Sequence, residues 1–205
     1  MKIQVRYPLL AALICFAWPL SAWAIGSPST NFFIKGLYHP MMVPAHLIAL
    51  FALGLLIGQQ GWATLRTAFP VFFVTLTAAL LMTRYQSAAW NAELVLLPLA
   101  ALTGVLVVLK LNLPKAIPLI IAIIAAIVIG MDSSVPRIPG LQATKIYAHL
   151  SGSGVFASLL LLMISLLALA LHKLLAGIVL RVLGAWSTAG AVLVVTLLLV
   201  ADANP

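Results

Sequence analysis

Apolar runs of helical length follow one another through almost the whole chain, and this pattern leaves few folds open. Of the 205 residues, 64% are hydrophobic and only 7% are charged, whereas a water-soluble domain carries roughly 25% charged residues. The side chains cannot cover a water-exposed surface, so most of the chain must face lipid. In lipid every backbone amide needs an internal partner, which leaves helices or closed barrels. The runs lack the alternation of a barrel strand, so we predict an all-α, polytopic membrane protein.

The first 24 residues have the pattern of a signal peptide. Lys2 and Arg6 precede an apolar stretch over residues 8–20, and the small-x-small sequence Ala22-Trp23-Ala24 follows. The stretch is short against the roughly 20 residues that a membrane span needs. We therefore predict a cleaved signal peptide over residues 1–24 and a single transmembrane domain over residues 25–205. An uncleaved additional helix is the alternative. The only cysteine, Cys15, lies in this segment, so the mature chain would form no disulfide.

Six apolar runs after this segment predict a bundle of about six transmembrane helices. The predicted helices are Pro44 to Gln60, Leu65 to Thr83, Ala92 to Leu109, Ala116 to Met131, His149 to His172 and Ile178 to Ala201. The preceding residues, 25–40, are interpreted as a polar-aromatic segment at the exported interface. Gly54 and Gly58 form a G-x-x-x-G pattern, for which packing within the bundle is favoured over a dimer interface.

The signal peptide predicts a bacterial inner (cytoplasmic) membrane protein with its mature N-terminus on the exported side. Six crossings return the C-terminus to that same side. Basic residues support this orientation only weakly, because they are almost evenly divided between the two sides. The predicted cytoplasmic turns hold Arg66, Lys110, Lys115, Lys173 and Arg181, and the exported loops hold Lys35, Arg84, Arg137 and Lys145.

The net charge of +8 does not indicate nucleic-acid binding, because the basic residues are scattered singly between apolar runs. Enzyme chemistry is also disfavoured. The chain has no glycine-rich phosphate loop, no Cys-His cluster and no Ser-His-Asp order typical of a hydrolase. We therefore expect a non-enzymatic protein with the lipid bilayer as its main partner and with no nucleic-acid partner.

Three histidines and an aspartate fall at the predicted exported face. His39 and His46 flank the start of the first helix, His149 opens the fifth, and Asp132 leaves the fourth. Imidazole and carboxylate together suit a divalent transition metal, so we predict a metal site of His39, His46, His149 and Asp132. Each residue also has a simpler explanation. Histidines can anchor helix ends at an interface, and Asp132 could pair with a nearby cation instead.

Two further ionisable residues, Glu93 and His172, lie at predicted helix ends. Glu93 lies at the same predicted face and follows Asn91 at a helix start, where both residues suit capping without any ligand role. The fourth histidine, His172, falls at the opposite face and is expected to be solvated there.

The stretch from Gly36 to Leu55, GLYHPMMVPAHLIALFALGL, resembles the opening of the HupE/UreJ family. These are hydrogenase and urease accessory membrane proteins, regarded as nickel and sometimes cobalt permeases. Their hallmark is a His-Pro followed by an Asp-His at the mouth of the first mature helix. His39-Pro40 and His46 match this hallmark, and the size, signal peptide and six-helix plan match as well. The resemblance implies Ni²⁺ or Co²⁺ as the transported or bound ion, and a protein partner in metalloenzyme maturation or in a membrane complex.

The chain departs from the family at its metal motifs. Ala45 stands where the family has aspartate. The later His-rich motif corresponds to residues 129–134, IGMDSS, which contain Asp132 but no histidine, and the fifth helix lacks a further histidine near Phe156. We predict a metal permease or metal-binding accessory protein. The alternative is a non-transporting membrane scaffold or assembly subunit, and it is favoured by these departures and by helix interiors that offer only hydroxyls and small residues.

Overall fold

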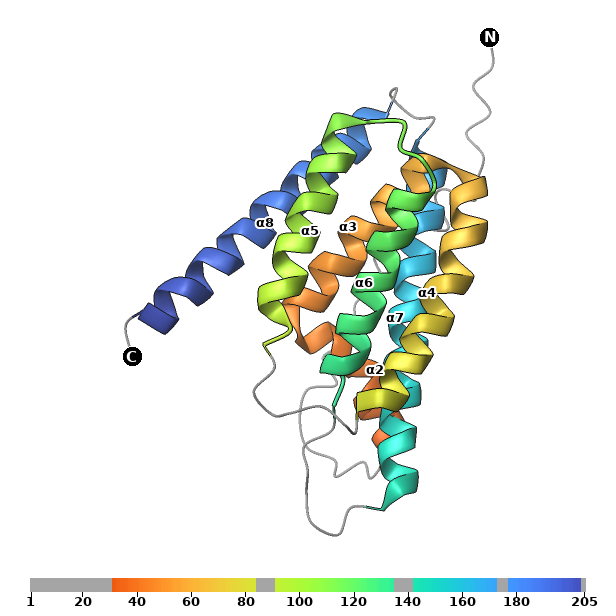
Figure 1. Cartoon of the computed structure of the whole chain (residues 1–205), viewed down its shortest axis with the longest axis vertical. Coiled ribbons are helices and arrows are strands. Elements are labelled where there is room, and N and C mark those ends of the chain that lie inside the picture. The colour runs from red at the N-terminus through yellow and green to blue at the C-terminus, as the bar shows by residue number, and fades with distance from the viewer. Residues whose placement is uncertain (1–30, 84–90, 135–141, 173–176, 204–205) are drawn as a thin grey trace, which may run out of the picture. The chain divides into compact units, whose positions relative to one another are not determined.

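The computed structural model describes residues 31–83, 91–134, 142–172 and 177–203, and these residues form helices joined by short turns. The residues from Asn31 onward belong to one compact unit, shown in Figure 1. The predicted signal peptide, residues 1–24, lies outside the described residues. The helices are α2 (Phe32–Met42), α3 (Pro44–Gln60), α4 (Trp62–Met82), α5 (Glu93–Leu109), α6 (Ala116–Asp132), α7 (Ala143–Leu171) and α8 (Ile178–Ala203). The prediction of an all-α fold is confirmed.

All six predicted helices are present, and most of their ends agree within a few residues. The largest shift is in α7, which begins at Ala143 instead of His149. The sequence prediction assigned no helix to residues 25–40 and interpreted them as a segment at the exported interface, a location that stays a prediction. Residues 32–42 form α2, a helix that packs mainly against α7.

The prediction of six membrane crossings is too high when the helices are judged by their length and apolarity. Among the helices of the described residues, α4, α7 and α8 alone are each long and apolar enough to span a membrane. A fourth span arises if α2 and α3, which are bent by 74° relative to one another, count as one broken span. Helices α5 and α6 are apolar but have 17 residues each, at the short limit for a span.

Helix α3 is the central element of the bundle. It packs against α4, α5, α6, α7 and α8, and most of its residues are buried around the whole circumference, as expected for a helix without a polar face. The predicted role of the G-x-x-x-G pattern is confirmed. A Cβ at Gly54 would overlap Ile164, and one at Gly58 would overlap Ala168 and the Ser165 carbonyl. The two glycines therefore serve close packing of α3 on α7 within one chain.

Successive helices from α3 to α8 run in alternating directions (Figure 1). The N-termini of α3, α5 and α7 therefore meet the C-termini of α4, α6 and α8 at one end of the bundle. At the opposite end, Gly61 adopts φ 96° between α3 and α4, a conformation that favours glycine. The end that carries α2 is the one at which the predicted metal-site residues gather.

Candidate functional site

The break between α2 and α3 places two of the predicted histidines beside one another. Val43, between the helices, is extended (φ −102°, ψ 103°), because the residue before a proline is pushed out of the helical region. Pro44 then starts α3, where its fixed φ and missing N–H are favourable. His39 in the last turn of α2 and His46 in the first turn of α3 meet edge to face, with ring centroids 5.9 Å apart.

Two glycines bring the third histidine into contact. A Cβ at Gly36 of α2 would overlap the carbonyl oxygen of His149, and a Cβ at Gly152 of α7 would overlap that of Phe33. The backbones of α2 and α7 therefore touch. As a result the His39 and His149 rings lie 5.5 Å apart, centroid to centroid.

Asp132 reaches the cluster from the end of α6. Its Oδ2 lies 3.0 Å from Nε2 of His46. His39 also interacts electrostatically with Asp132 as well as with the two other histidines. The sequence placed these four residues at one face of the membrane, and the structure brings them into a single group, which we call the His–Asp cluster (His39, His46, Asp132, His149).

Hydroxyl hydrogen bonds hold the helix end that carries Asp132. The Ser153 hydroxyl of α7 donates to Oγ of Ser133 at 3.0 Å, and the Ser133 hydroxyl donates to the Ile129 carbonyl at 2.8 Å. Thr83, at the end of α4, donates to the Gly130 carbonyl at 3.1 Å. These bonds tie α4, α6 and α7 together directly beneath the cluster, and such outer contacts orient ligand side chains at metal sites.

The cluster contains buried polar atoms without hydrogen-bond partners. His46 is completely buried, and neither of its ring nitrogens has a partner in hydrogen-bond geometry within the described residues. Its close approach to Asp132 therefore lacks the angle of a hydrogen bond. Nε2 of His39 is unpartnered as well. Because a buried nitrogen without a partner is costly, such groups call for a ligand, an ion or a water.

The donor atoms nevertheless do not converge on one point. Within the described residues, no group of three or more His, Cys, Asp or Glu side chains is arranged to hold a metal ion. The rings are neighbours, but side-chain rotation would be needed to direct three donors at a common ion. Glu93 makes no ion pair within the described part of the chain. His172 caps the far end of α7, about 34 Å from His149 by helical rise.

Two lysines at the mouth of the cluster were not identified as site residues from the sequence. The ammonium groups of Lys35 and Lys145 lie 5.4 and 5.7 Å from the centre of the Phe32 ring, within cation–π range. Lys35 also acts electrostatically on His149. The sequence signal was the spacing Phe32-x-x-Lys35, which brings the two side chains together only once α2 is known to be a helix. The local charge of the site is therefore not strongly negative.

Apolar helices that enclose an imidazole and carboxylate cluster at one end define a polytopic membrane protein with a polar site at one membrane face. Comparison with known families agrees with this class. Residues 10–194 match the family described as HupE / UreJ protein. The match covers most of the chain, and the chain belongs to this family. No curated protein and no solved structure matches it. The family suggests a membrane accessory protein or one related to nickel or cobalt transport.

Proposed function

We propose that the chain binds a divalent transition metal ion, nickel or cobalt, at the His–Asp cluster and passes it across the inner membrane. The supporting observation is the proximity of three imidazoles and one carboxylate from four helices, with buried ring nitrogens that lack partners. In this proposal the cluster lies on the exported side and captures the ion there.

The chemistry of the donors favours this class of ion. The cluster offers a single carboxylate, whereas a hard cation such as Mg²⁺ or Ca²⁺ prefers several oxygen ligands. Neutral imidazoles suit nickel and cobalt. Asp132 has a further role in the proposal. Ala45, at the family's aspartate position, is buried, and Asp132 supplies from α6 a carboxylate beside His46.

The test is nickel and cobalt accumulation in cells that express the protein, compared with the double variant His39→Ala/His46→Ala at matched membrane abundance. His172→Ala is the matched control, because it removes a histidine at the other end of α7. We expect accumulation to fall to background in the double variant and to stay unchanged in the control. Equal accumulation in the wild type, the double variant and cells without the protein would refute transport.

A non-transporting scaffold or assembly subunit is the second candidate, and two observations favour it. The donor atoms do not converge within the described residues, and the buried polar groups deeper in the described helices are uncharged. These groups are Gln59, Thr64, Thr103, Ser158, Ser165 and Ser187. The scaffold predicts stable co-purification with a protein partner and no nickel above background, whereas a purified monomer with stoichiometric nickel would exclude it.

A further inference from the structure

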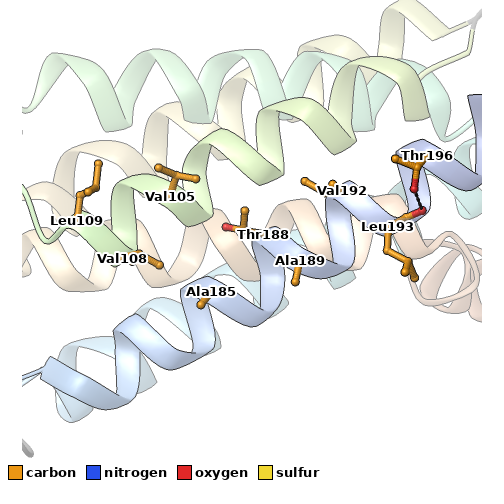
Figure 2. Close-up of a pocket in the computed structure, with 9 residues that line it drawn as sticks. All are labelled: Val105, Val108, Leu109, Ala185, Thr188, Ala189, Val192, Leu193 and Thr196. Atoms are coloured by element: carbon orange, nitrogen blue, oxygen red, sulfur yellow. Dashed lines mark hydrogen bonds between the residues drawn. The ribbon is translucent and has the colours of Figure 1, made fainter.

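An open apolar groove runs along the α5–α8 pair, away from the His–Asp cluster. The helices cross where Gly104 meets Gly184, because a Cβ on either glycine would overlap the other helix. Along this pair lies a groove with a volume of about 650 Å³ (Figure 2). Its lining comes from Val105, Val108, Leu109, Ala185, Thr188, Ala189, Val192, Leu193 and Thr196. Figure 1 shows α8 diverging from α5 toward its C-terminal end.

The two hydroxyls in the lining are engaged by the protein. Thr188 donates to the Gly184 carbonyl at 2.9 Å, and Thr196 donates to the Leu193 carbonyl at 2.8 Å, the bond drawn in Figure 2. Their polar atoms therefore need no partner from an occupant. The groove offers an apolar wall, and Leu193 is still 61% exposed. An aliphatic chain fits this surface, whereas a polar solute would find only the acceptor lone pairs of two hydroxyls.

The length of the groove matches one membrane leaflet. The α8 lining extends from Ala185 to Thr196, about 16 Å at 1.5 Å per residue. Half of the roughly 30 Å hydrocarbon core is about 15 Å. A fatty-acyl chain that enters from one membrane surface would therefore follow the groove to near the bilayer centre.

A cationic group stands at the head of the groove. Arg181 precedes Ala185 by four residues, so it lies one turn above the lining on the same face of α8. Its Nε donates to the carbonyl of Val108, a lining residue, at 2.9 Å. The guanidinium has four further N–H donors. Lys110, which ends α5, places its ammonium beside Gly177 at the start of α8.

This end of the bundle is basic throughout its described part. Arg66 and Lys115 open α4 and α6 there, whereas Glu93 and Asp132 lie at the opposite end of α5 and α6. An apolar groove of leaflet length below a cationic head is complementary to a lipid with a negatively charged phosphate headgroup. A second copy of the chain with the same orientation in the membrane would bring an equally basic end beside this one. The resulting charge repulsion favours an anionic lipid over a second copy as the occupant of the groove.

We propose that the α5–α8 groove is a binding site for an anionic membrane phospholipid, with one acyl chain along the groove and the headgroup phosphate at Arg181. This inference is independent of metal transport. The site would favour phosphatidylglycerol over the zwitterionic phosphatidylcholine, because only the former carries a net negative charge to Arg181.

The test uses the full chain in mild detergent, with lipid retention measured by native mass spectrometry after addition of equal amounts of the two lipids. Wild-type protein is expected to retain phosphatidylglycerol about fivefold more than phosphatidylcholine, as one surface cation would provide. Arg181→Gln removes this preference. Ala189→Phe fills the groove and lowers retention of both lipids. Matched controls, Lys115→Gln and Val182→Phe, change an equivalent charge and an exposed α8 residue outside the groove, and both behave like wild type.

Equal retention of the two lipids by wild type would overturn the proposal. So would wild-type retention in Ala189→Phe, or wild-type preference in Arg181→Gln. A lipid-free wild-type dimer that Ala189→Phe converts to monomer would assign the groove to a second copy of the chain and overturn it as well.

Discussion

The His–Asp cluster depends on two glycines that have no side chain with which to bind a ligand. Gly36 lies under the His149 backbone and Gly152 under that of Phe33, so α2 can approach α7 only where side chains are absent. The 5.5 Å separation of the His39 and His149 rings depends on this contact. The positions of the cluster residues are therefore set by two glycines that a search for metal motifs does not detect.

Substitution of Gly36 by alanine tests this dependence. The added Cβ would overlap the His149 carbonyl oxygen, which belongs to the backbone and cannot rotate away. We expect the free energy of unfolding to fall by about 1–3 kcal/mol, as overpacking usually costs. The matched control is Gly190→Ala in α8, where a Cβ meets open space and alanine should be neutral or stabilising by up to about 1 kcal/mol. Thermal unfolding in detergent measures both, and equal midpoints would contradict the packing argument.

Asp132 should contribute to metal affinity through its charge. Asp132→Asn keeps the shape of the side chain but removes the carboxylate 3.0 Å from His46. If the cluster binds nickel, the affinity of the purified protein should fall about tenfold or more, as for other changes of a ligand or its support. Glu93→Gln neutralises an acid at the same end of the bundle outside the cluster and should leave affinity unchanged. An identical loss in both variants would show that general charge, not the cluster, governs binding.

The membership of the cluster could be predicted from the sequence, but its geometry could not. Alternating helix directions place His39, His46, Asp132 and His149 at one end of the bundle. Hydropathy gives no information on the rotation of each helix about its axis, nor on which helices are neighbours. The proximity of Asp132 to His46 depends on the packing of α6 and α3 within the bundle, and this proximity is determined by the whole set of helix contacts.

At the scale of elements, the apolar runs predicted the long helices well and missed the short one. Helix α2 contains Gly36 and Pro40, which have the lowest helix propensities. Its stability comes from packing on α7 and not from its own sequence. The predicted start of α7 is six residues too late, because the prediction followed apolar residues. Thr144 and Lys145 are polar, but they belong to the first turn of the helix.

A glutamine holds the turn between α5 and α6 to the central helix. Gln60 donates from Nε2 to the Leu111 carbonyl at 2.8 Å and accepts from the Leu113 amide at 3.2 Å. Both bonds lie at the end of the bundle remote from the cluster, next to the left-handed Lys110. The Gln60 side chain thus supplies hydrogen-bond partners for two backbone groups of the turn between α5 and α6.

Gln60→Ala should therefore destabilise the fold by about 1 kcal/mol, the usual net value of such bonds. The neighbouring Gln59→Leu is the control. Gln59 is buried and donates from Nε2 to the Val107 carbonyl at 3.0 Å, while its Oε1 has no partner within the described residues. The Val107 carbonyl also accepts from the Lys110 amide, so an apolar residue of similar size should change stability by less than about 0.5 kcal/mol. Denaturation in detergent distinguishes the two, and a larger loss for Gln59→Leu would contradict this assignment.

For the molecule as a whole, the two ends of the bundle have different chemistry. One end gathers three imidazoles and the Asp132 carboxylate around the α2–α3 break, and the other carries the basic residue Arg181 beside the α5–α8 groove. The largely buried α3 connects the two ends. Among the described basic residues, four lie at the end remote from the cluster, whereas Lys35 and Lys145 lie at the cluster end. This modest excess favours a cytoplasmic location for the remote end.

The short helices α5 and α6 make the number of membrane crossings the decisive question at this scale. If every helix from α3 to α8 crosses, the turn after α5 lies on the side opposite the start of α5 and the start of α7. Single cysteines at Asn91, Leu111, Gln142 and Ile178 test this, because these residues are exposed and Cys15, the only native cysteine, can be replaced by serine.

An impermeant thiol reagent added to intact spheroplasts should label positions 91 and 142, and labelling of positions 111 and 178 should require membrane disruption. This pattern would establish that α5 and α6 span the membrane despite their 17 residues, with local thinning or flanking residues covering the difference. Labelling of position 111 together with 91 and 142 would instead show that α5 and α6 enter and leave on the same side. The crossings would then reduce to the helices that length alone supports, and the basic turn at Lys110 would no longer face the cytoplasm.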